Sequence, residues 1–124
     1  MKKYFLQIIL LIFFILSSFS NADVKSVMQK GKEYNKNNQY QLAIDEYKKL
    51  VRDGYEGTSL FYNLGNAHYR LGKVGYAILY YEKALKISAS DEDVKHNLVL
   101  AKLNIKDKVD ELPPFFIFNI YGSM

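Results

Sequence analysis

The sequence predicts an all-α fold, a short solenoid of two helix-turn-helix repeats followed by a closing helix. The first reason is internal repetition, because the chain resembles itself when it is shifted by 34 residues. The second is helical periodicity, because apolar residues recur at steps of three and four within each repeat. Identical residues coincide after the shift at several of the positions that define the repeat: Gly31 and Gly65, Ala43 and Ala77, Ile44 and Ile78, and Tyr47 and Tyr81.

Residues 1–22 have the three-part layout of a secretory signal peptide. The segment begins with the basic residues Lys2-Lys3 and continues with an apolar stretch from Tyr4 to Leu16. It ends with the small residues Ser20-Asn21-Ala22, which suit a signal-peptidase cleavage site. The longest uninterrupted apolar run has nine residues, well short of the roughly 20 that span a bilayer. We therefore expect export with cleavage before Asp23, and an uncleaved membrane anchor is the alternative.

Composition narrows the function of the remaining residues 23–124, which suffice for one small domain. The chain carries a formal charge of +4, to which Lys2 and Lys3 contribute. The other basic residues are scattered along polar helix faces, so nucleic acid is not an expected partner. The absence of cysteine excludes disulfides, and packing must supply the stability.

Repeat two, residues 58–91, has the more regular pattern. Its two helices are expected to meet at the turn Leu71-Gly72-Lys73. Gly65 and Ala77 lack bulk, so the two helix axes can approach closely where they cross. The expected inner positions are Phe61, Leu64, His68 and Leu71 on the first helix, and Val74, Ala77, Ile78, Tyr81, Ala84 and Leu85 on the second.

Repeat one, residues 23–57, keeps this pattern with losses. Residues 37–39 are expected to form its turn, and Gly54 and Gly57 the break before repeat two. Its expected inner positions are Val27, Gly31 and Tyr34 on the first helix, and Tyr40, Ala43, Ile44, Tyr47 and Val51 on the second.

A third helical pattern covers residues 92–112 and is expected to close the array. Ser90 is expected to cap this helix, with Asp93 completing a capping box. The inner stripe consists of Val94, Leu98, Ala101 and Ile105. The apolar tail, residues 113–124, begins with two prolines that end any helix. It could pack on the array, dock on a partner, lie at a membrane surface or be the stump of a longer segment.

These repeats resemble the tetratricopeptide repeat (TPR) family in their period and in the repeat-defining residues Gly31, Ala43, Tyr47, Gly65, Ala77, Tyr81 and Ala84. Repeat one departs from the family pattern at Lys30 and Leu50, where an aliphatic and a small residue are usual. The resemblance implies a scaffold whose first helices line a concave face that binds proteins. Two repeats are few for independent stability, so we also expect a partner or a second copy, as a homo-oligomer, to cover an open end.

The repeat register places a peptide-sized groove on that concave face. Tyrosine rings would hold apolar anchors, asparagine amides an extended backbone, and basic side chains acidic groups. The predicted partner-binding residues are Tyr62, Asn66, Tyr69 and Arg70, with Lys32 and Lys36 as secondary candidates, and Met28 and Asn35 fall on the same face. The carboxylate clamp of chaperone-binding TPR domains is not reproduced, because Met28 and Leu100 occupy positions that should be polar.

No residue pattern indicates catalysis, a metal site or a cofactor. His68 and His96 lack metal-ligand spacing, and His68 falls on a core stripe where we expect it to be packed. The acidic run Asp91-Glu92-Asp93 suits the start of a helix. The sequence thus predicts a binding protein that is not an enzyme and has no cofactor.

Two segments resemble a narrower family, the BatE-type TPR proteins of bacterial aerotolerance (Bat) operons. They are residues 72–85 and residues 91–98, the latter followed by Ala101-Lys102, Asp107-Lys108-Val109 and Leu112-Pro113. The resemblance implies a periplasmic, membrane-associated protein that acts with von Willebrand A-type Bat proteins in oxidative-stress tolerance. A membrane segment follows in that family, so residues 113–124 would be its stump and the chain a truncated form. Self-assembly through the ends and the tail is the alternative function.

Overall fold

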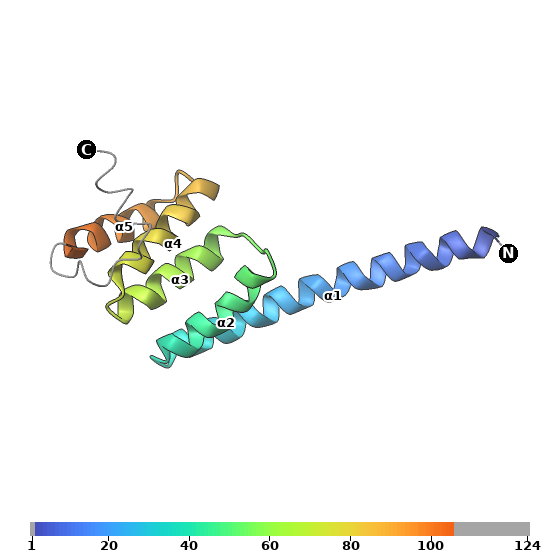
Figure 1. The fold of residues 1–124 in the computed structure, drawn as a ribbon, viewed down its shortest axis with the longest axis horizontal. Helices are drawn as coiled ribbons and strands as arrows, with labels where there is room; N and C mark the ends of the chain where they lie inside the picture. Colours follow the sequence, from blue (N-terminus) through green and yellow to red (C-terminus); the bar gives the residue numbers. More distant parts are fainter. Residues whose placement is uncertain (1, 106–124) are drawn as a thin grey trace.

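A computed structural model describes residues 2–105, and the side chains of residues 2–15 and 23–105. This described part contains five α-helices and no strand: α1 (Lys2–Lys36), α2 (Tyr40–Arg52), α3 (Thr58–Arg70), α4 (Val74–Ile87) and α5 (Glu92–Asn104). They form two helix pairs and a further helix (Figure 1), which confirms the predicted all-α repeat fold. The expected end of the closing helix, residues 106–112, and the tail, residues 113–124, lie outside the described residues, as do the side chains at the expected cleavage point.

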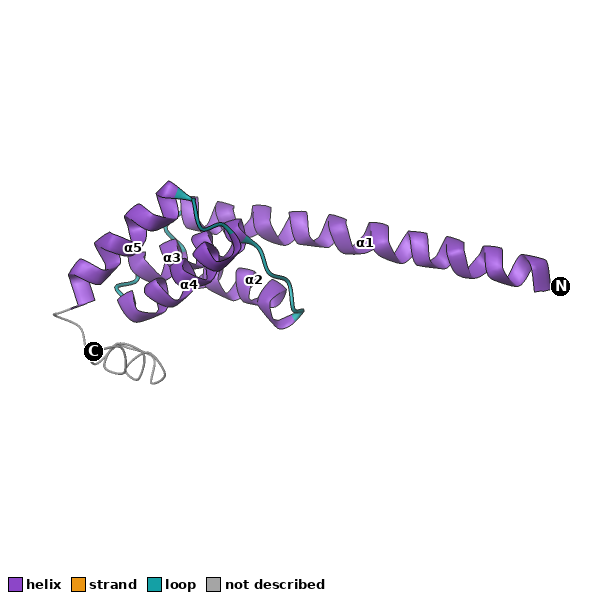
Figure 2. Cartoon of the chain, turned by 90° about the horizontal axis from the view of Figure 1, so that it is seen from above, coloured by secondary structure: helices purple, strands orange, loops and turns teal. Residues whose placement is uncertain are grey.

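Each helix packs on the next one in the chain, and the first helices of successive units also contact one another. Contacts join α1 to α2, α2 to α3, α3 to α4 and α4 to α5, while α3 also contacts both α1 and α5. Figure 2 shows this array from above, with α1 extending far beyond it. The helices α1, α3 and α5 therefore line one side of the array.

The turns within the two repeats have the same backbone geometry. Asn38 and Gly72, which are 34 residues apart, adopt positive φ angles of 60° and 77°. Glycine and asparagine are the residues that enter this left-handed region most readily. The predicted turns at residues 37–39 and 71–73 are confirmed, and Gly54, with φ of 81°, lies in the break between the repeats.

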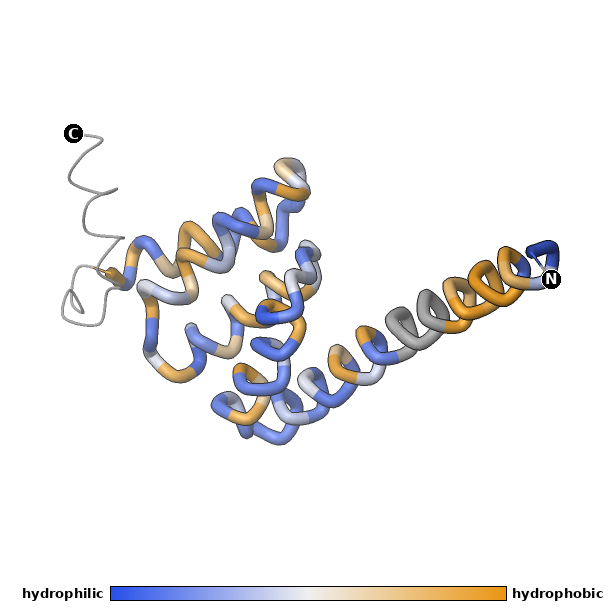
Figure 3. The backbone as a smooth tube through the Cα atoms, turned by 45° about the vertical axis from the view of Figure 1, so that its right-hand side comes forward, coloured by the Kyte–Doolittle hydropathy of each residue, from blue (hydrophilic) through white to orange (hydrophobic). Residues whose placement is uncertain are grey.

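The N-terminal part of α1 lies outside the core. Its apolar residues from Tyr4 to Ile15 are 47–74% exposed, and Figure 3 shows them as an apolar stretch that leads away from the array. Packing against the core begins at Val24 and Val27. Among the helical residues with described side chains, none forms a segment both long and apolar enough to cross a membrane.

The tightest contact in each repeat places a tyrosine ring on a helical glycine. Tyr81 is 1% exposed and crosses Gly65 so closely that a Cβ atom on the glycine would lie 2.5 Å from Cε1 of the ring. Tyr47, which is fully buried, covers Gly31 in the same way. The close approach predicted at Gly65 is confirmed, and a tyrosine ring from the second helix fills the space that the glycine leaves.

Three local predictions are wrong. Tyr40, expected at an inner position of repeat one, lies outside the core, and its hydroxyl accepts hydrogen bonds from Arg70. Leu71, expected in the core, is 39% exposed, because α3 ends at Arg70 and the chain turns away at its C-cap. Ser90 does not cap α5, since the N-cap is Asp91, whose carboxylate accepts a 3.1 Å hydrogen bond from the Val94 backbone N–H. A carboxylate at this position also interacts favourably with the helix dipole, which an uncharged hydroxyl does much less.

An ion pair explains the irregular Lys30 of repeat one. Glu46 is buried, and its carboxylate lies 2.7 Å from the Lys49 ammonium and 3.8 Å from that of Lys30. The equivalent residues of repeat two, 34 positions later, are the buried Leu64 and Tyr80. Repeat one therefore has an ion pair where repeat two has two buried apolar side chains, and Lys30 accompanies Glu46 because an unpaired buried carboxylate is costly.

His68 is a packed core histidine, as predicted. It is 3% exposed and stacks against the rings of Tyr76 and Tyr80 at centroid distances of 5.2 and 5.4 Å. Neither ring nitrogen has a hydrogen-bond partner among the described residues. Burial, together with the positive charges of Lys48 and Lys73, lowers the pKa of His68 from 6.5 to about 4. The imidazole is therefore neutral at pH 7.

Replacing Gly65 with alanine should destabilise the fold although alanine favours helices. The intrinsic gain is about 1 kcal/mol, but the new methyl group overlaps the Tyr81 ring, and overpacking of this kind costs about 1–3 kcal/mol. Because the overlap is severe, the overpacking cost should fall in the upper part of that range, about 2–3 kcal/mol, and we expect a net loss of about 1–2 kcal/mol in denaturant unfolding. Ser59→Ala, on the exposed face of the same helix, is the control and should change little. A Gly65→Ala chain as stable as wild type would contradict the contact.

The stability of the fold should depend on pH through His68. The pKa of His68 is lower in the folded chain, so between about pH 4 and 6.5 the unfolded chain binds more protons and stability rises with pH. The full effect is about 3 kcal/mol, at about 1.4 kcal/mol per pKa unit. His68→Phe keeps an aromatic ring and should remove this part of the slope in unfolding titrations at several pH values. The control His96→Gln changes an exposed histidine and should keep the rise of stability with pH. If His68→Phe also kept that rise, the buried His68 would not be its cause.

Candidate functional site

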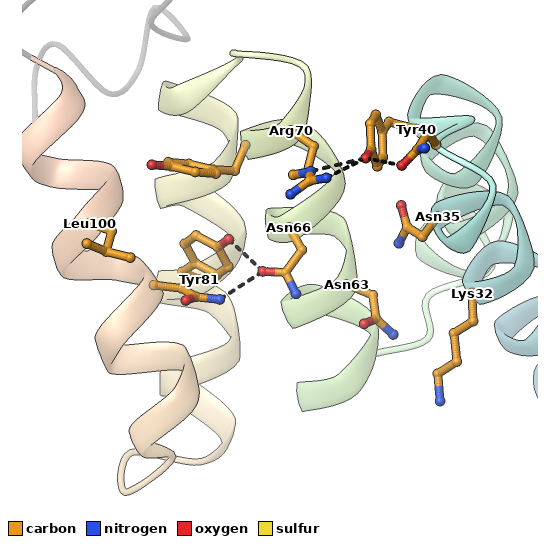
Figure 4. A pocket seen from close by; sticks show the side chains of 11 residues that line it. Lys32, Asn35, Tyr40, Asn63, Asn66, Arg70, Tyr81 and Leu100 are labelled. Carbon is orange, nitrogen blue, oxygen red and sulfur yellow. Dashed lines mark hydrogen bonds between the residues drawn. The ribbon is translucent and has the colours of Figure 1, made fainter.

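A groove of about 510 Å³ opens on the side of the array lined by α1, α3 and α5 (Figure 4). Its volume falls in the range of about 300–1,000 Å³ that is typical of ligand pockets. The turn after α1 and the start of α2 add two residues, and one side chain reaches the groove from α4. The lining residues are Lys32, Asn35, Asn38, Tyr40, Asn63, Asn66, Tyr69, Arg70, Tyr81, Asn97 and Leu100.

The groove brings together four of the six predicted partner-binding residues, Lys32, Asn66, Tyr69 and Arg70. The other two do not line it. Tyr62 is half-buried, and its hydroxyl accepts a 3.2 Å hydrogen bond from Asn97. Lys36 is exposed in the last turn of α1. Met28, expected on the same face, packs against the core instead.

Sequence reasoning missed several asparagines of the groove. Asn63 and Asn97 are 34 residues apart, and Gln29 takes the corresponding place in repeat one. An amide side chain at the same position of all three first helices was therefore the available signal. The sequence pattern places Tyr81 only in the core. Its ring is indeed buried there, but the side chain is long enough that it also lines the groove.

Hydrogen bonds between side chains join α4 and α5 to α3 along the groove. The Tyr81 hydroxyl donates to Asn66 Oδ1 at 2.7 Å, and Asn97 Nδ2 donates to the same oxygen at 3.0 Å. Asn104 Nδ2 donates to the Tyr69 hydroxyl at 2.7 Å. Burial raises the pKa of Tyr81, with Tyr69 and Tyr62 adding to the shift. Tyr81 is therefore a neutral donor, and the polar groups on this side satisfy one another.

A second set of bonds joins the end of α3 to the turn after α1. The Arg70 guanidinium donates to the Tyr40 hydroxyl through Nε at 3.1 Å and Nη2 at 2.9 Å. Tyr40 donates in turn to Asn38 Oδ1 at 2.6 Å. These bonds cross from repeat two to repeat one, and they hold Arg70 at the edge of the groove without neutralising its charge.

Polar groups between α1 and α3 are less satisfied. Asn35 Nδ2 lies 3.5 Å from the Tyr47 hydroxyl, at the limit of hydrogen bonding, and Asn35 Oδ1 is buried with no partner among the described residues. Burial raises the pKa of Tyr47 to about 12, although donation from Asn35 acts in the opposite direction. Figure 4 shows Lys32, Asn35 and Asn63 without hydrogen bonds to the other residues drawn.

The electrostatic character of the groove is positive. Lys32 and Arg70 are among its lining residues, and no aspartate or glutamate is part of the lining set. Lys32 forms no ion pair within residues 2–105. The groove can therefore bind anionic groups, and its amides can bind a peptide backbone. In the described part of the chain, no three side chains of the His, Cys, Asp or Glu type are grouped so that they could hold a metal.

Asn97→Ala should loosen α5 specifically, because it removes two donors that α5 sends to α3. We expect a loss of about 1–2 kcal/mol and faster hydrogen exchange of α5 amides, while exchange in α1 and α2 stays unchanged. His96→Ala, the exposed neighbour on the same helix, serves as the control. Unchanged α5 protection in Asn97→Ala would show that the amide bonds are not what holds this helix.

Both repeats match models of a known protein family. Two family models, both described as tetratricopeptide repeat, match residues 24–52 and residues 59–91, which together make up half of the 124 residues. A search of curated proteins gives no match. The first match covers the C-terminal part of α1 together with α2, and the second covers α3 and α4. In each, a tyrosine at the equivalent position covers the equivalent glycine. The chain therefore belongs to the tetratricopeptide repeat family.

Proposed function

We propose that this protein is an exported adaptor that holds a protein partner in the groove between α1, α3 and α5. The observation that carries this proposal is the lining of the groove, which combines asparagine amides, tyrosines and two cations without a carboxylate. TPR repeats are protein-interaction scaffolds, in general without catalytic activity, and this supports an adaptor rather than an enzyme.

The small number of repeats among the described residues supports the need for a partner. Residues 2–105 contain two repeats, fewer than the three or so that a solenoid usually needs for stability. On α5, only Val94 and Ala101 are fully buried, so this helix contributes little to the core. A ligand that bridges the first helices would add contacts at low cost in ordering, because the groove walls are already formed.

The cellular compartment and the identity of the partner are inferred from particular stretches of the sequence. The resemblance of residues 72–85 and 91–98 to BatE-type proteins supports action in the periplasm, at the membrane, with von Willebrand A-type Bat proteins as partners. The composition of residues 1–22 supports export. The apolar residues from Tyr4 to Ile15 contribute nothing to the buried core, so their removal by a signal peptidase would leave the core intact.

Self-association is a second candidate function, favoured by the outer face of α5. Val99 and Leu103 on this helix are 57% and 70% exposed. Apolar side chains grouped on one short helix are typical of surfaces that another protein covers. A second copy of the chain would serve, as would residues 113–124.

Site-specific photocrosslinking in the native host separates these functions. A benzoylphenylalanine at Asn63 samples the groove, one at Leu103 samples the outer face of α5, and one at Lys86 on α4 is the exposed control. We expect a protein adduct from position 63 and none from position 86, and a von Willebrand A-type protein in that adduct would support the Bat assignment. Adducts confined to position 103 and to copies of this chain would refute the adaptor and support self-association.

A further inference from the structure

The groove has a closed half and an open half, and the repeat register explains the difference. In repeat two, Asn66 Oδ1 accepts hydrogen bonds from Tyr81 and from Asn97 of the following helix. The residues 34 positions earlier are Lys32, Tyr47 and Asn63. The tyrosine on the second helix of repeat one and the asparagine on the following helix, α3, are thus kept, but the acceptor between them is replaced by a lysine.

This replacement leaves polar groups on both α1 and α3 without the hydrogen bonds that their counterparts make. Lysine has no acceptor atom, so neither Tyr47 nor Asn63 can bond to Lys32 as Tyr81 and Asn97 do to Asn66. The side chains of Lys32 and Asn63 form no hydrogen bond to any described residue. Asn35, one helical turn after Lys32, has the buried and unpartnered Oδ1 atom. Buried polar atoms are normally satisfied, so this oxygen requires a donor.

We propose that the α1–α3 half of the groove, formed by Lys32, Asn35 and Asn63, binds an acidic peptide segment of the partner. The inference rests on the proposed adaptor function and specifies its ligand. A carboxylate side chain of the segment pairs with the Lys32 ammonium, a peptide N–H donates to Asn35 Oδ1, and Asn63 bonds the peptide main chain.

The charges of the groove favour this ligand. Lys32 has no competing carboxylate among the lining residues, and Arg70 adds a second positive charge at the groove edge. Asn35 needs a donor while Lys32 needs an acceptor, and an acidic peptide supplies both. The predicted residues Asn66, Tyr69 and Arg70 then mainly border the peptide site. Asn66 Oδ1, the Tyr69 hydroxyl and Arg70 Nε and Nη2 are already bonded to Asn97, Asn104 and Tyr40, in that order.

The test uses a display library of randomised eight-residue segments, selected on the full chain, followed by synthesis of the selected peptides with both ends blocked. We expect the selected peptides to be rich in aspartate and glutamate. Lys32→Asn, which restores the acceptor found in repeat two, should weaken binding about fivefold or more and raise the thermal midpoint. It should also reduce the salt dependence of binding.

Lys36→Asn is the matched control, because Lys36 lies one turn further on α1 and outside the groove. It should bind the peptides as wild type does. Exchange of the peptide carboxylates for amides should weaken binding to wild type but hardly affect binding to Lys32→Asn.

Selected peptides without acidic enrichment, or equal binding by Lys32→Asn and wild type, would overturn this inference. If such peptides still compete for the Asn63 crosslink, the adaptor function stands with a different ligand. If no peptide binds at millimolar concentration and position 63 gives no adduct, the proposed function itself is refuted.

Discussion

The rest of this structure depends on one contact, the packing of a tyrosine ring against a helical glycine. Tyr81 on Gly65 and Tyr47 on Gly31 bring the two helices of each repeat close together, since a larger residue at either glycine would overlap the ring. The same rings carry hydroxyl groups to the groove side of the array, where Tyr81 bonds Asn66 and Tyr47 lies near Asn35. Core packing and groove chemistry are therefore coupled, because one side chain in each repeat takes part in both.

Most of the fold could be predicted from sequence because the repeat duplicates its signals. Asn38 and Gly72 mark equivalent turns, and the buried alanines and tyrosines recur at the same spacing. The failures occur where a prediction depends on one residue's position at a helix end. Leu71 continues the apolar spacing of α3 but falls beyond its last turn, and Asp91 takes the cap position expected for Ser90. Periodicity identifies the face of a helix, whereas the helix ends are decided by local backbone geometry.

The groove was less predictable, for a physical reason. Register indicated correctly that Lys32, Asn66, Tyr69 and Arg70 share one face, but it does not say which polar groups bond to each other. Tyr62 is turned toward Asn97, and Arg70 is held by Tyr40, which is 30 residues earlier in the sequence. Such partnerships depend on distances between helices that pack through their apolar faces. A pattern in one sequence gives those distances only approximately, while hydrogen bonds require them within a few tenths of an ångström.

The two repeats differ in a way that divides stability from binding. Repeat two has buried apolar side chains at Leu64 and Tyr80, and the Asn66 Oδ1 acceptor is satisfied within the chain by Tyr81 and Asn97. Repeat one has charges at both equivalent places, Lys30 with Glu46 and the unpaired Lys32. The first lysine is compensated by a buried carboxylate and the second is not. Binding sites commonly sacrifice local stability for groups that a ligand completes. The two lysines that make repeat one irregular therefore differ in role. Lys30 pairs with Glu46 inside the chain, whereas Lys32 has no ion-pair partner among the described residues and is the one suited to recognition.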